Sequence, residues 1–140
     1  MSHAVADAEL RRIMAASRRI AVVGISDKPS RPSHMVARYL KDHGYCIVPV
    51  NPKLTEVLGE KCYPDLASIP EPVDMVDVFR QAVDCPPVAA AAVAVGAKVL
   101  WLQLGIVSEE ARRIAAAGGL TVVMDRCLKI EHARLQHAGL

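Results

Sequence analysis

The chain contains 140 residues, of which 52 % are hydrophobic and 23 % are charged, and its formal net charge is +2. This length predicts a single domain over residues 1–140, and the near-neutral charge with only 4 % aromatic residues argues against a nucleic-acid-binding surface. Every apolar stretch is shorter than the about 18 residues of a membrane span, and the first residues lack a secretory signal, so we expect a cytoplasmic chain with reduced cysteines.

Five runs of apolar and β-branched residues recur along the chain at spacings of roughly 20 to 30 residues, which is the rhythm of strands alternating with helices. Most of these runs are continuously apolar, as is typical of strands whose two faces are both covered. We therefore predict a doubly wound α/β domain with a five-stranded, mainly parallel sheet and helices on both faces. The predicted strands are Ile20–Gly24, Cys46–Val50, Val73–Phe79, Lys98–Leu104 and Leu120–Met124.

Helices are predicted at Asp7–Ser17, Ser33–His43, Asp84–Val95, Ser108–Ala117 and Lys129–Leu135. The third of these begins Asp-Cys-Pro-Pro, a pattern that predicts Asp84 as its N-cap. The rest of that helix is almost all alanine and valine, so we expect it to be well covered by neighbouring elements. Leu54–Pro72 is too proline-rich for a covering helix, and we expect a loop there with a short helical turn near Asp65–Ser68.

The loop after the first strand is the first candidate ligand site, because ligands of open α/β sheets bind at the carboxyl ends of the strands. Gly24–His34 combines one glycine with hydroxyl groups, Lys28 and Arg31, and it leads into a helix N-terminus. Such a turn can hold a phosphate, although an ordinary polar loop has the same composition. The loop does not contain the GxGxxG pattern of dinucleotide-binding proteins.

The loops after the next three strands offer further polar residues. Asn51, Pro52 and Lys53 stand where an NAD site has an acidic residue, and a lysine there favours a ribose that carries a phosphate, as in NADP or coenzyme A (CoA). The alternative is a turn followed by a solvated lysine. Phe79-Arg80 and Gln103-Leu104-Gly105 follow the third and fourth strands. Phe79 can lie against an adenine or a pantetheine arm, and Gly105 can permit close approach of a ligand.

The sequence predicts neither a metal site nor a catalytic residue. The cysteines at 46, 62, 85 and 127 form no CxxC pair, and the five histidines have no metal-ligand spacing. We expect Cys46 to lie in the core, because it is part of a strand pattern. Cys127 is interpreted as a structural cysteine rather than a nucleophile, although His132 is near in sequence. Asp74 and Asp77 fall on opposite faces of one strand and cannot act as an acid–base pair.

Several segments together resemble one known family. They are VVGISDKPSRPSHMVARYLKDHGYCIVPVNP, LGEKCYPDLASIP, VDMVDVFR, GAKVLWLQLGIVSEEA and VVMDRCLKIEHARL. In this order they resemble the stand-alone CoA-binding-domain proteins, which are similar to the N-terminal domain of the succinyl-CoA synthetase α subunit. The resemblance covers about residues 5 to 135. It implies a Rossmann-like fold and a non-catalytic protein that binds CoA or an acyl-CoA.

The resemblance also implies which residues meet the ligand: Gly24, Ile25, Ser26, Arg31, Ser33, Pro52, Lys53, Phe79, Arg80, Gln103, Leu104 and Gly105. It places the CoA phosphates on the Gly24–Ser33 turn. Because Cys127 lies at the end of the last strand, a mixed disulfide with the CoA thiol is a further hypothesis. The catalytic histidine of the synthetase lies in a second domain, so its ligase chemistry does not carry over. The apolar helix Asp84–Val95 departs from the family and suggests a homodimer or a protein partner. The alternatives are an NADP-dependent oxidoreductase and the CoA-binding partner subunit of a separate acyl-CoA ligase.

Overall fold

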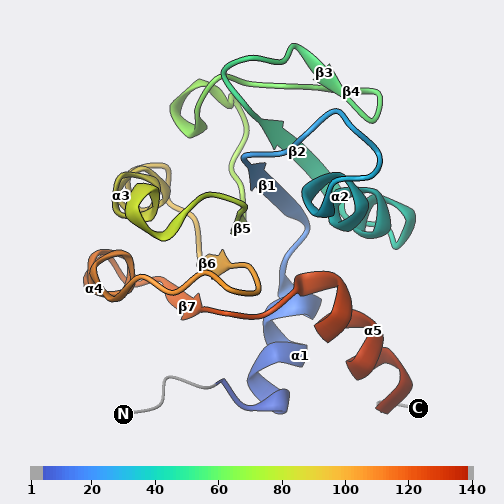
Figure 1. Ribbon diagram of the computed structural model, residues 1–140. Helices are drawn as coiled ribbons and strands as arrows, with labels where there is room; N and C mark the ends of the chain where they lie inside the picture. Colours follow the sequence, from blue (N-terminus) through green and yellow to red (C-terminus); the bar gives the residue numbers. More distant parts are fainter. Residues whose placement is uncertain (1–4, 139–140) are drawn as a thin grey trace.

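A computed structural model describes residues 5–138 of the chain, and its centre is a five-stranded sheet (Figure 1). The strand order is β2-β1-β5-β6-β7, and all of these strands are parallel. The order reverses between β1 and β5, because the chain moves outward from β1 to β2 and then returns to β5 on the other side. The strands are β1 (Arg19–Val23), β2 (Cys46–Val50), β5 (Met75–Val78), β6 (Val99–Leu102) and β7 (Thr121–Val123).

Helices cover both faces of this sheet (Figure 1). One face carries α1 (Asp7–Ala16), α2 (Pro32–Asp42) and α5 (Leu128–Ala138), and the other carries α3 (Cys85–Ala94) and α4 (Glu109–Ala117). The predicted Rossmann-like α/β fold is therefore confirmed, and the predicted helices and strands differ from the observed ones by a few residues at their ends. No helix within residues 5–138 has the length and apolar character to cross a membrane.

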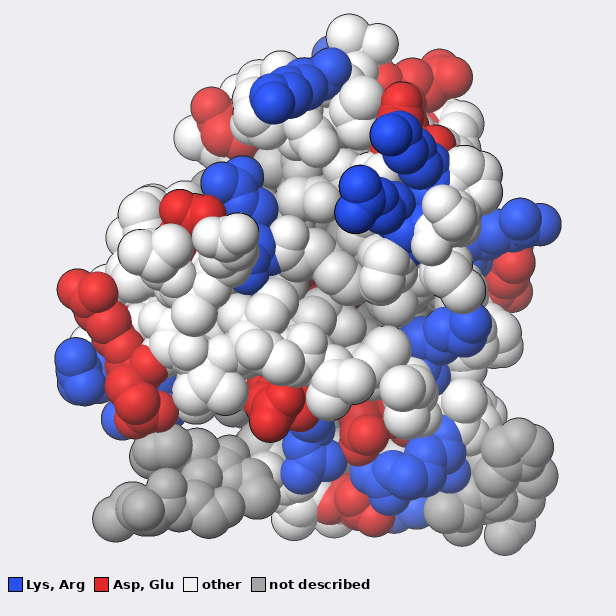
Figure 2. Space-filling model, in the orientation of Figure 1, with Lys and Arg blue, Asp and Glu red and all other residues white. Residues whose placement is uncertain are grey.

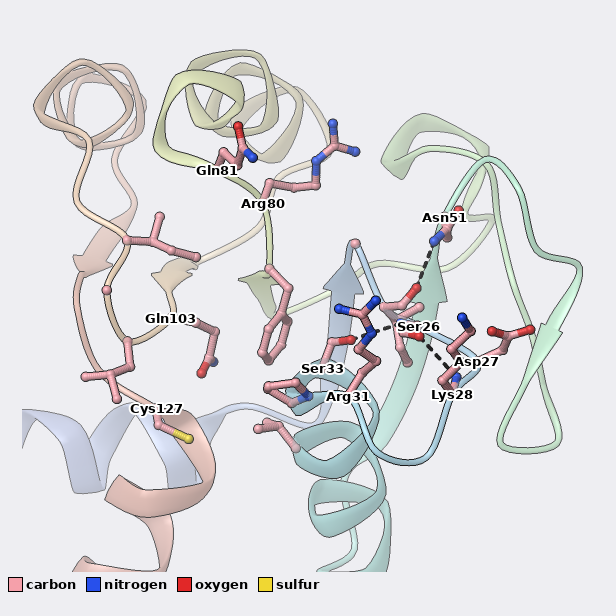
Figure 3. Close-up of a pocket in the computed structure, with 18 of the residues that line it drawn as sticks. Ser26, Asp27, Lys28, Arg31, Ser33, Asn51, Arg80, Gln81, Gln103 and Cys127 are labelled. Carbon is pink, nitrogen blue, oxygen red and sulfur yellow. Dashed lines mark hydrogen bonds between the residues drawn. The ribbon is translucent and has the colours of Figure 1, made fainter.

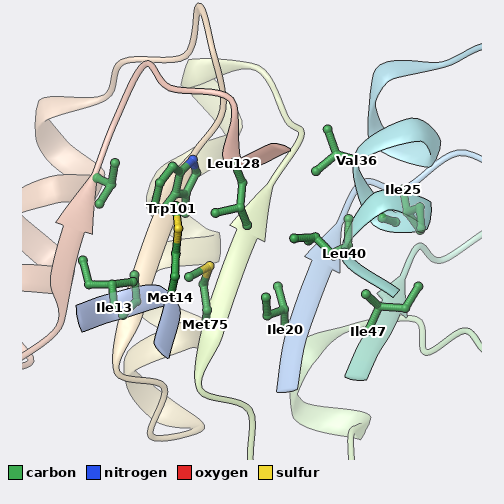
Figure 4. Packing of buried hydrophobic residues seen from close by; sticks show 14 of the residues in the cluster. Ile13, Met14, Ile20, Ile25, Val36, Leu40, Ile47, Met75, Trp101 and Leu128 are labelled. Carbon is green, nitrogen blue, oxygen red and sulfur yellow. The ribbon is translucent and has the colours of Figure 1, made fainter. Parts of the chain in front are cut away.

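The core is divided into two layers by the sheet, and β1 contributes to both of them. Ile20 and Val22 pack with α1, α2 and α5, whereas Ala21 and Val23 pack toward α3 and α4. Figure 4 shows the first layer, in which Trp101, Met14 and Leu128 meet above the sheet. Burial on both faces explains why the strands are continuously apolar in sequence.

The alanine-rich helix α3 is covered on one side by α4, through small residues. Ala89 and Ala92 are fully buried, and a Cβ on Gly118 would lie 2.5 Å from a Val93 methyl carbon. Ala90 and Ala94 are exposed, so neighbouring elements cover this helix less completely than its apolar sequence suggests. The homodimer or protein partner expected at this helix stays a prediction.

Asp84 occupies the N-cap position that the sequence predicts for this helix, but its side chain does not cap the helix. Its side chain accepts no capping hydrogen bond, and its backbone is helical, because it closes the short 3₁₀ turn η2 (Ala82–Asp84) that runs directly into α3. The carboxylate instead lies 3.6 Å from the guanidinium of Arg80.

The segment between β2 and β5 contains a small hairpin that the sequence analysis does not predict. It consists of β3 (Glu56–Val57) and β4 (Glu60–Lys61), and the 3₁₀ turn η1 (Leu66–Ser68) follows. Leu58 and Gly59 join the two strands with φ angles of 55° and 75°. Leucine rarely adopts a positive φ, so the usual Asn-Gly signal of such a turn is missing here.

The outer edge of β2 is partly covered by the chain that follows the hairpin. The N–H of Tyr63 donates to the Pro49 carbonyl, and the N–H of Asn51 donates to the Tyr63 carbonyl. At the other end of β2, Cys46 is exposed rather than in the core as expected, because it is the first residue of an edge strand.

Candidate functional site

A pocket of about 1150 Å³ opens at the carboxyl ends of the strands, where the strand order reverses. The loops after β1, β2, β5 and β6 and the start of α5 line it. In Figure 2, Lys and Arg side chains flank a hollow whose surface is mostly uncharged. This is the place where an open α/β sheet binds its ligand.

Gly24 ends β1 on the floor of this pocket and permits the close approach of two strands. Its φ is +86°, and a Cβ at this position would lie 2.5 Å from the Phe79 carbonyl oxygen and 3.0 Å from the Arg80 side chain. Its N–H donates to the Val50 carbonyl at the end of β2. Any larger residue would both strain the backbone and push the ends of β1 and β5 apart.

Short hydrogen bonds hold the loop from Gly24 to Ser33 in a fixed shape (Figure 3). The N–H of Ser26 donates to Ser33 Oγ over 2.9 Å, and the N–H of Lys28 donates to Ser26 Oγ over 3.0 Å. His34 Nδ1 lies 3.0 Å from the Ser26 carbonyl oxygen, and the Asn51 amide donates to the Ile25 carbonyl over 2.8 Å. Asn51 therefore braces the loop from the end of β2, a role that the sequence interpretation as a simple turn misses.

The end of the pocket at this loop is cationic. Lys28, Arg31 and Lys53 line it, all three are exposed, and none has an ion-pair partner among residues 5–138. Asp27 is the one acidic lining residue there. The first turn of α2 also faces the pocket with no side-chain cap in the described structure, so its N–H groups add to the positive potential.

The opposite end of the pocket is uncharged (Figure 3). Gln103 is buried after β6, and Cys127 lies across from it at the start of α5. Two exposed apolar side chains, Leu104 and Ile130, form the rim. Phe79 lies between the two ends and is half-buried.

The pocket brings together all of the residues that the sequence analysis proposes as ligand-binding, except Pro52, which lies outside the lining. It adds residues that the sequence analysis did not propose, among them Asn51, Gln81, Ala82, Ile106 and Ile130. Their positions next to the proposed loops are the one signal that could have indicated them. Whether these residues bind a ligand is not tested by their placement alone, so their roles stay predictions.

Asp77 is a buried carboxyl group next to the pocket that the sequence analysis sets aside. It lies in β5, is fully buried and accepts a hydrogen bond from the Gln103 side chain. Burial raises its pKa to about 7, while the hydrogen bond from Gln103 acts in the opposite direction. The sequence did contain a signal for this buried carboxyl group, namely an acidic residue within a strand that is covered on both faces. Aspartate is almost never fully buried unless it is paired, and such groups are concentrated at functional sites.

The other buried titratable groups lie outside the pocket lining. Among residues 5–138, no group of three or more His, Cys, Asp or Glu side chains is placed to hold a metal ion. Cys62 and Cys85 are buried, and burial raises the pKa of both thiols. His132 is not near enough to Cys127 for a hydrogen bond, and its Nδ1 instead lies 2.8 Å from the hydroxyl of Tyr39.

Comparison with known proteins gives a consistent result. The family profile described as "CoA binding domain" matches residues 18–133. YneT of Bacillus subtilis (strain 168) is 47 % identical over 126 residues, which are 90 % of this chain and 93 % of that protein. An ADP-forming acetate–CoA ligase (II) of Archaeoglobus fulgidus is 33 % identical over 96 residues, which cover 67 % of this chain but 14 % of the ligase.

Solved structures show the same likeness. A hypothetical protein from Pyrococcus horikoshii OT3 superposes with a TM-score of 0.92 and 39 % sequence identity, covering 97 % of this chain and 99 % of that one. The strand order, the pocket at its reversal point and the family match over most of the sequence agree with one another. The chain belongs to the CoA-binding domain family.

Proposed function

We propose that this protein binds CoA or an acyl-CoA in the pocket and does not itself transform it. The observation that carries this proposal is the division of one continuous pocket into a cationic end and an uncharged end. CoA is divided in the same way, since its phosphates lie at one end of the molecule and its neutral pantetheine arm and thiol at the other.

The phosphates of the ligand lie in this proposal on the Gly24–Ser33 turn. Arg31 can form a bidentate contact with a phosphate. The oxygen of the Ser33 hydroxyl accepts the Ser26 N–H, and the hydroxyl hydrogen remains to be donated to a phosphate oxygen. Lys53 follows β2, where a ribose is expected, and meets the 3′-phosphate. Both cations are exposed and available to an anionic ligand.

The pantetheine arm then crosses Phe79 and reaches Gln103 and Cys127. An uncharged arm needs an uncharged wall, and the side chains at that end provide one. The rim residues Leu104 and Ile130 offer apolar contacts to an acyl group. The titratable groups that line the pocket include neither a histidine nor a pair of carboxylates, which agrees with a binding function rather than acid–base catalysis.

Isothermal titration of the ligand-free protein with CoA, acetyl-CoA, NAD and NADP tests this proposal. We expect the CoA species to bind and the dinucleotides to bind at least tenfold more weakly, about 1.4 kcal/mol. Preferential binding of NADP would replace the proposal with the oxidoreductase alternative. Absence of binding by all four ligands would refute it.

A second candidate is a CoA-binding subunit of a separately encoded acyl-CoA ligase. The similarity to a much longer acetate–CoA ligase favours it, because this chain aligns with one small part of that protein. Co-purification of a ligase subunit with the tagged chain from cells that express both would support this candidate. If no such subunit is recovered, the stand-alone binding function is the better account.

A further inference from the structure

The buried pair Asp77–Gln103 forms the innermost polar contact beside the pocket. Asp77 is fully buried in the middle of β5, where its register neighbours are Val22 of β1 and Trp101 of β6. Its Oδ1 accepts a hydrogen bond from the Gln103 Nε2, and its Oδ2 has no partner among residues 5–138. A buried carboxylate with so few partners costs stability, so its presence calls for a functional reason.

The amide of Gln103 is oriented by this contact. The residue is 4 % exposed and lines the pocket, and its backbone is fixed by bonds to Val78 and Ile106. An ionised carboxylate can only accept hydrogen bonds, so the NH₂ side of the amide must turn toward Asp77. The carbonyl oxygen of the amide is then left without a partner in the described structure and is available to the pocket, opposite the cationic loop (Figure 3).

We propose that Asp77 is a positioning residue that holds the Gln103 amide with its carbonyl oxygen toward the ligand, where it accepts a hydrogen bond from an amide N–H of a pantetheine arm. This inference rests on the proposed function and deepens it. The cationic end of the pocket recognises any nucleotide phosphate, whereas the Asp77–Gln103 pair recognises the arm that distinguishes CoA from other nucleotides. Gln103 makes the contact with the arm, and Asp77 acts on the ligand only by orienting Gln103.

The proposal makes the contact depend on the protonation of Asp77. A protonated Asp77 can donate to the Gln103 carbonyl, which turns the amide and presents its NH₂ group to the ligand instead. The NH₂ group of Gln103 then faces the amide N–H of the pantetheine arm, and two donors cannot form a hydrogen bond, so the contact is lost. The burial of Asp77 brings its pKa to about 7, so this change falls in an accessible pH range.

Three titratable side chains near the pocket lie on the same face of the sheet as Asp77. On this face of the sheet α2 contributes His34, α5 contributes His132, and Cys127 precedes α5. None of the three is a cause of the raised pKa of Asp77, which is due to burial. The buried side chains of α1, β1 and β6 on this face are apolar: Leu10, Ile13, Met14, Ile20, Val22, Val99 and Trp101.

Calorimetric titration between about pH 6 and pH 8.5 tests the proposal with two probes. The probes are CoA and adenosine 3′,5′-bisphosphate, which lacks the pantetheine arm. At pH 8 we expect Asp77→Asn to weaken CoA by about 3- to 10-fold, the range of one uncharged hydrogen bond, and to leave the bisphosphate unchanged. Wild-type affinity for CoA falls toward pH 6 more steeply than that of Asp77→Asn, and this difference isolates Asp77 from the titration of the ligand itself.

Gln103→Ala separates positioning from a general structural effect. It is expected to cause a similar loss for CoA, and Asp77→Asn should cause little further loss when it is added to Gln103→Ala, because both act through the same contact. Equal losses for CoA and the bisphosphate, or additive losses in the double variant, would overturn the proposal. If the wild-type chain binds no CoA, the proposed function fails as well, and the two failures are thus distinguished.

Discussion

The two ends of the pocket are built in different ways, although both follow parallel strands. The end formed by the Gly24–Ser33 loop carries full charges on exposed side chains above a backbone held by several hydrogen bonds. The end formed by the loop after β6 carries uncharged groups and depends on one buried pair, Asp77 with Gln103. Charge attracts anions of many kinds, whereas an oriented amide discriminates between ligands, so we expect affinity and specificity to reside at opposite ends.

The largest difference between the two ends is expected from their glycines. Gly24 and Gly105 have nearly equal φ angles, +86° and +85°, but a Cβ meets the Phe79 oxygen at 2.5 Å in the first case and no described atom within 4 Å in the second. Gly105→Ala should lower the free energy of unfolding by about 1–2 kcal/mol through backbone strain. Gly24→Ala should lower it by a further 1–3 kcal/mol, roughly, because the strand ends must separate. Urea unfolding measures both, and equal losses would show that the close approach is unimportant.

The second prediction concerns the stability of the uncharged end as a function of pH. Because burial raises the pKa of Asp77 from 3.8 to about 7, the folded state holds this proton more tightly than the unfolded state. The free energy of unfolding therefore decreases as pH rises from about 4 to about 7, because Asp77 loses its proton more readily in the unfolded state. Above pH 7 the buried carboxylate lowers the stability of the folded state by about 4 kcal/mol. Asp77→Asn should remove much of this cost and be more stable than wild type at pH 8.

Asp74→Asn provides the matched control for that experiment. Asp74 precedes the same strand and accepts hydrogen bonds from the N–H groups of Arg18 and Arg19. Its replacement weakens these bonds, so this variant should be less stable than wild type at pH 8. A loss of stability in both variants would contradict the interpretation of Asp77 as a costly buried ion.

The third prediction concerns the cationic end. Lys53→Ala should weaken CoA binding by about 1–3 kcal/mol, the range of a charge-assisted hydrogen bond, and Arg31→Ala should do the same. Dephospho-CoA should be insensitive to Lys53→Ala if that lysine meets the 3′-phosphate. Lys98→Ala is the control, because Lys98 is an exposed lysine just before β6, at the amino ends of the strands and thus opposite the pocket. Equal loss for CoA and dephospho-CoA would remove the assignment to the 3′-phosphate.

The fourth prediction, with the smallest expected effect, is the formation of a disulfide between the protein and CoA. This reaction reports which end of the pocket holds the ligand thiol. CoA disulfide can exchange with the Cys127 thiolate, which forms a Cys127–CoA disulfide and releases one CoA thiolate. Intact-mass spectrometry should show the addition of one CoA that dithiothreitol removes, and Cys127→Ser should abolish it. Cys46 is more exposed but lies at the opposite edge of the sheet, so Cys46→Ser should leave the adduct unchanged. An adduct on Cys46 rather than Cys127 would argue against a thiol at this end of the pocket.

The sequence predicts the fold well because the apolar runs of the strands and the stops of the helices are local signals. Eleven of the twelve residues proposed as ligand-binding line the pocket, because the topology brings the carboxyl ends of parallel strands together. The hairpin β3–β4 escaped prediction because Leu58 adopts a positive φ without a recognisable turn sequence. The roles of Asn51 and Asp77 escaped because each depends on a partner that is distant in sequence, Ile25 in one case and Gln103 in the other.

The proline in β2 has a consequence for how this chain can assemble. The Pro49 carbonyl points away from β1 toward Tyr63, so the nitrogen of Pro49 lies on the same outer side and has no hydrogen to donate. Tyr63 also occupies the Asn51 N–H on that side. Another strand therefore finds no free backbone partner at Pro49 or Asn51, which discourages edge-to-edge pairing along the carboxyl-terminal half of β2. A protein that contacts this half of the edge must recognise side chains rather than a free backbone.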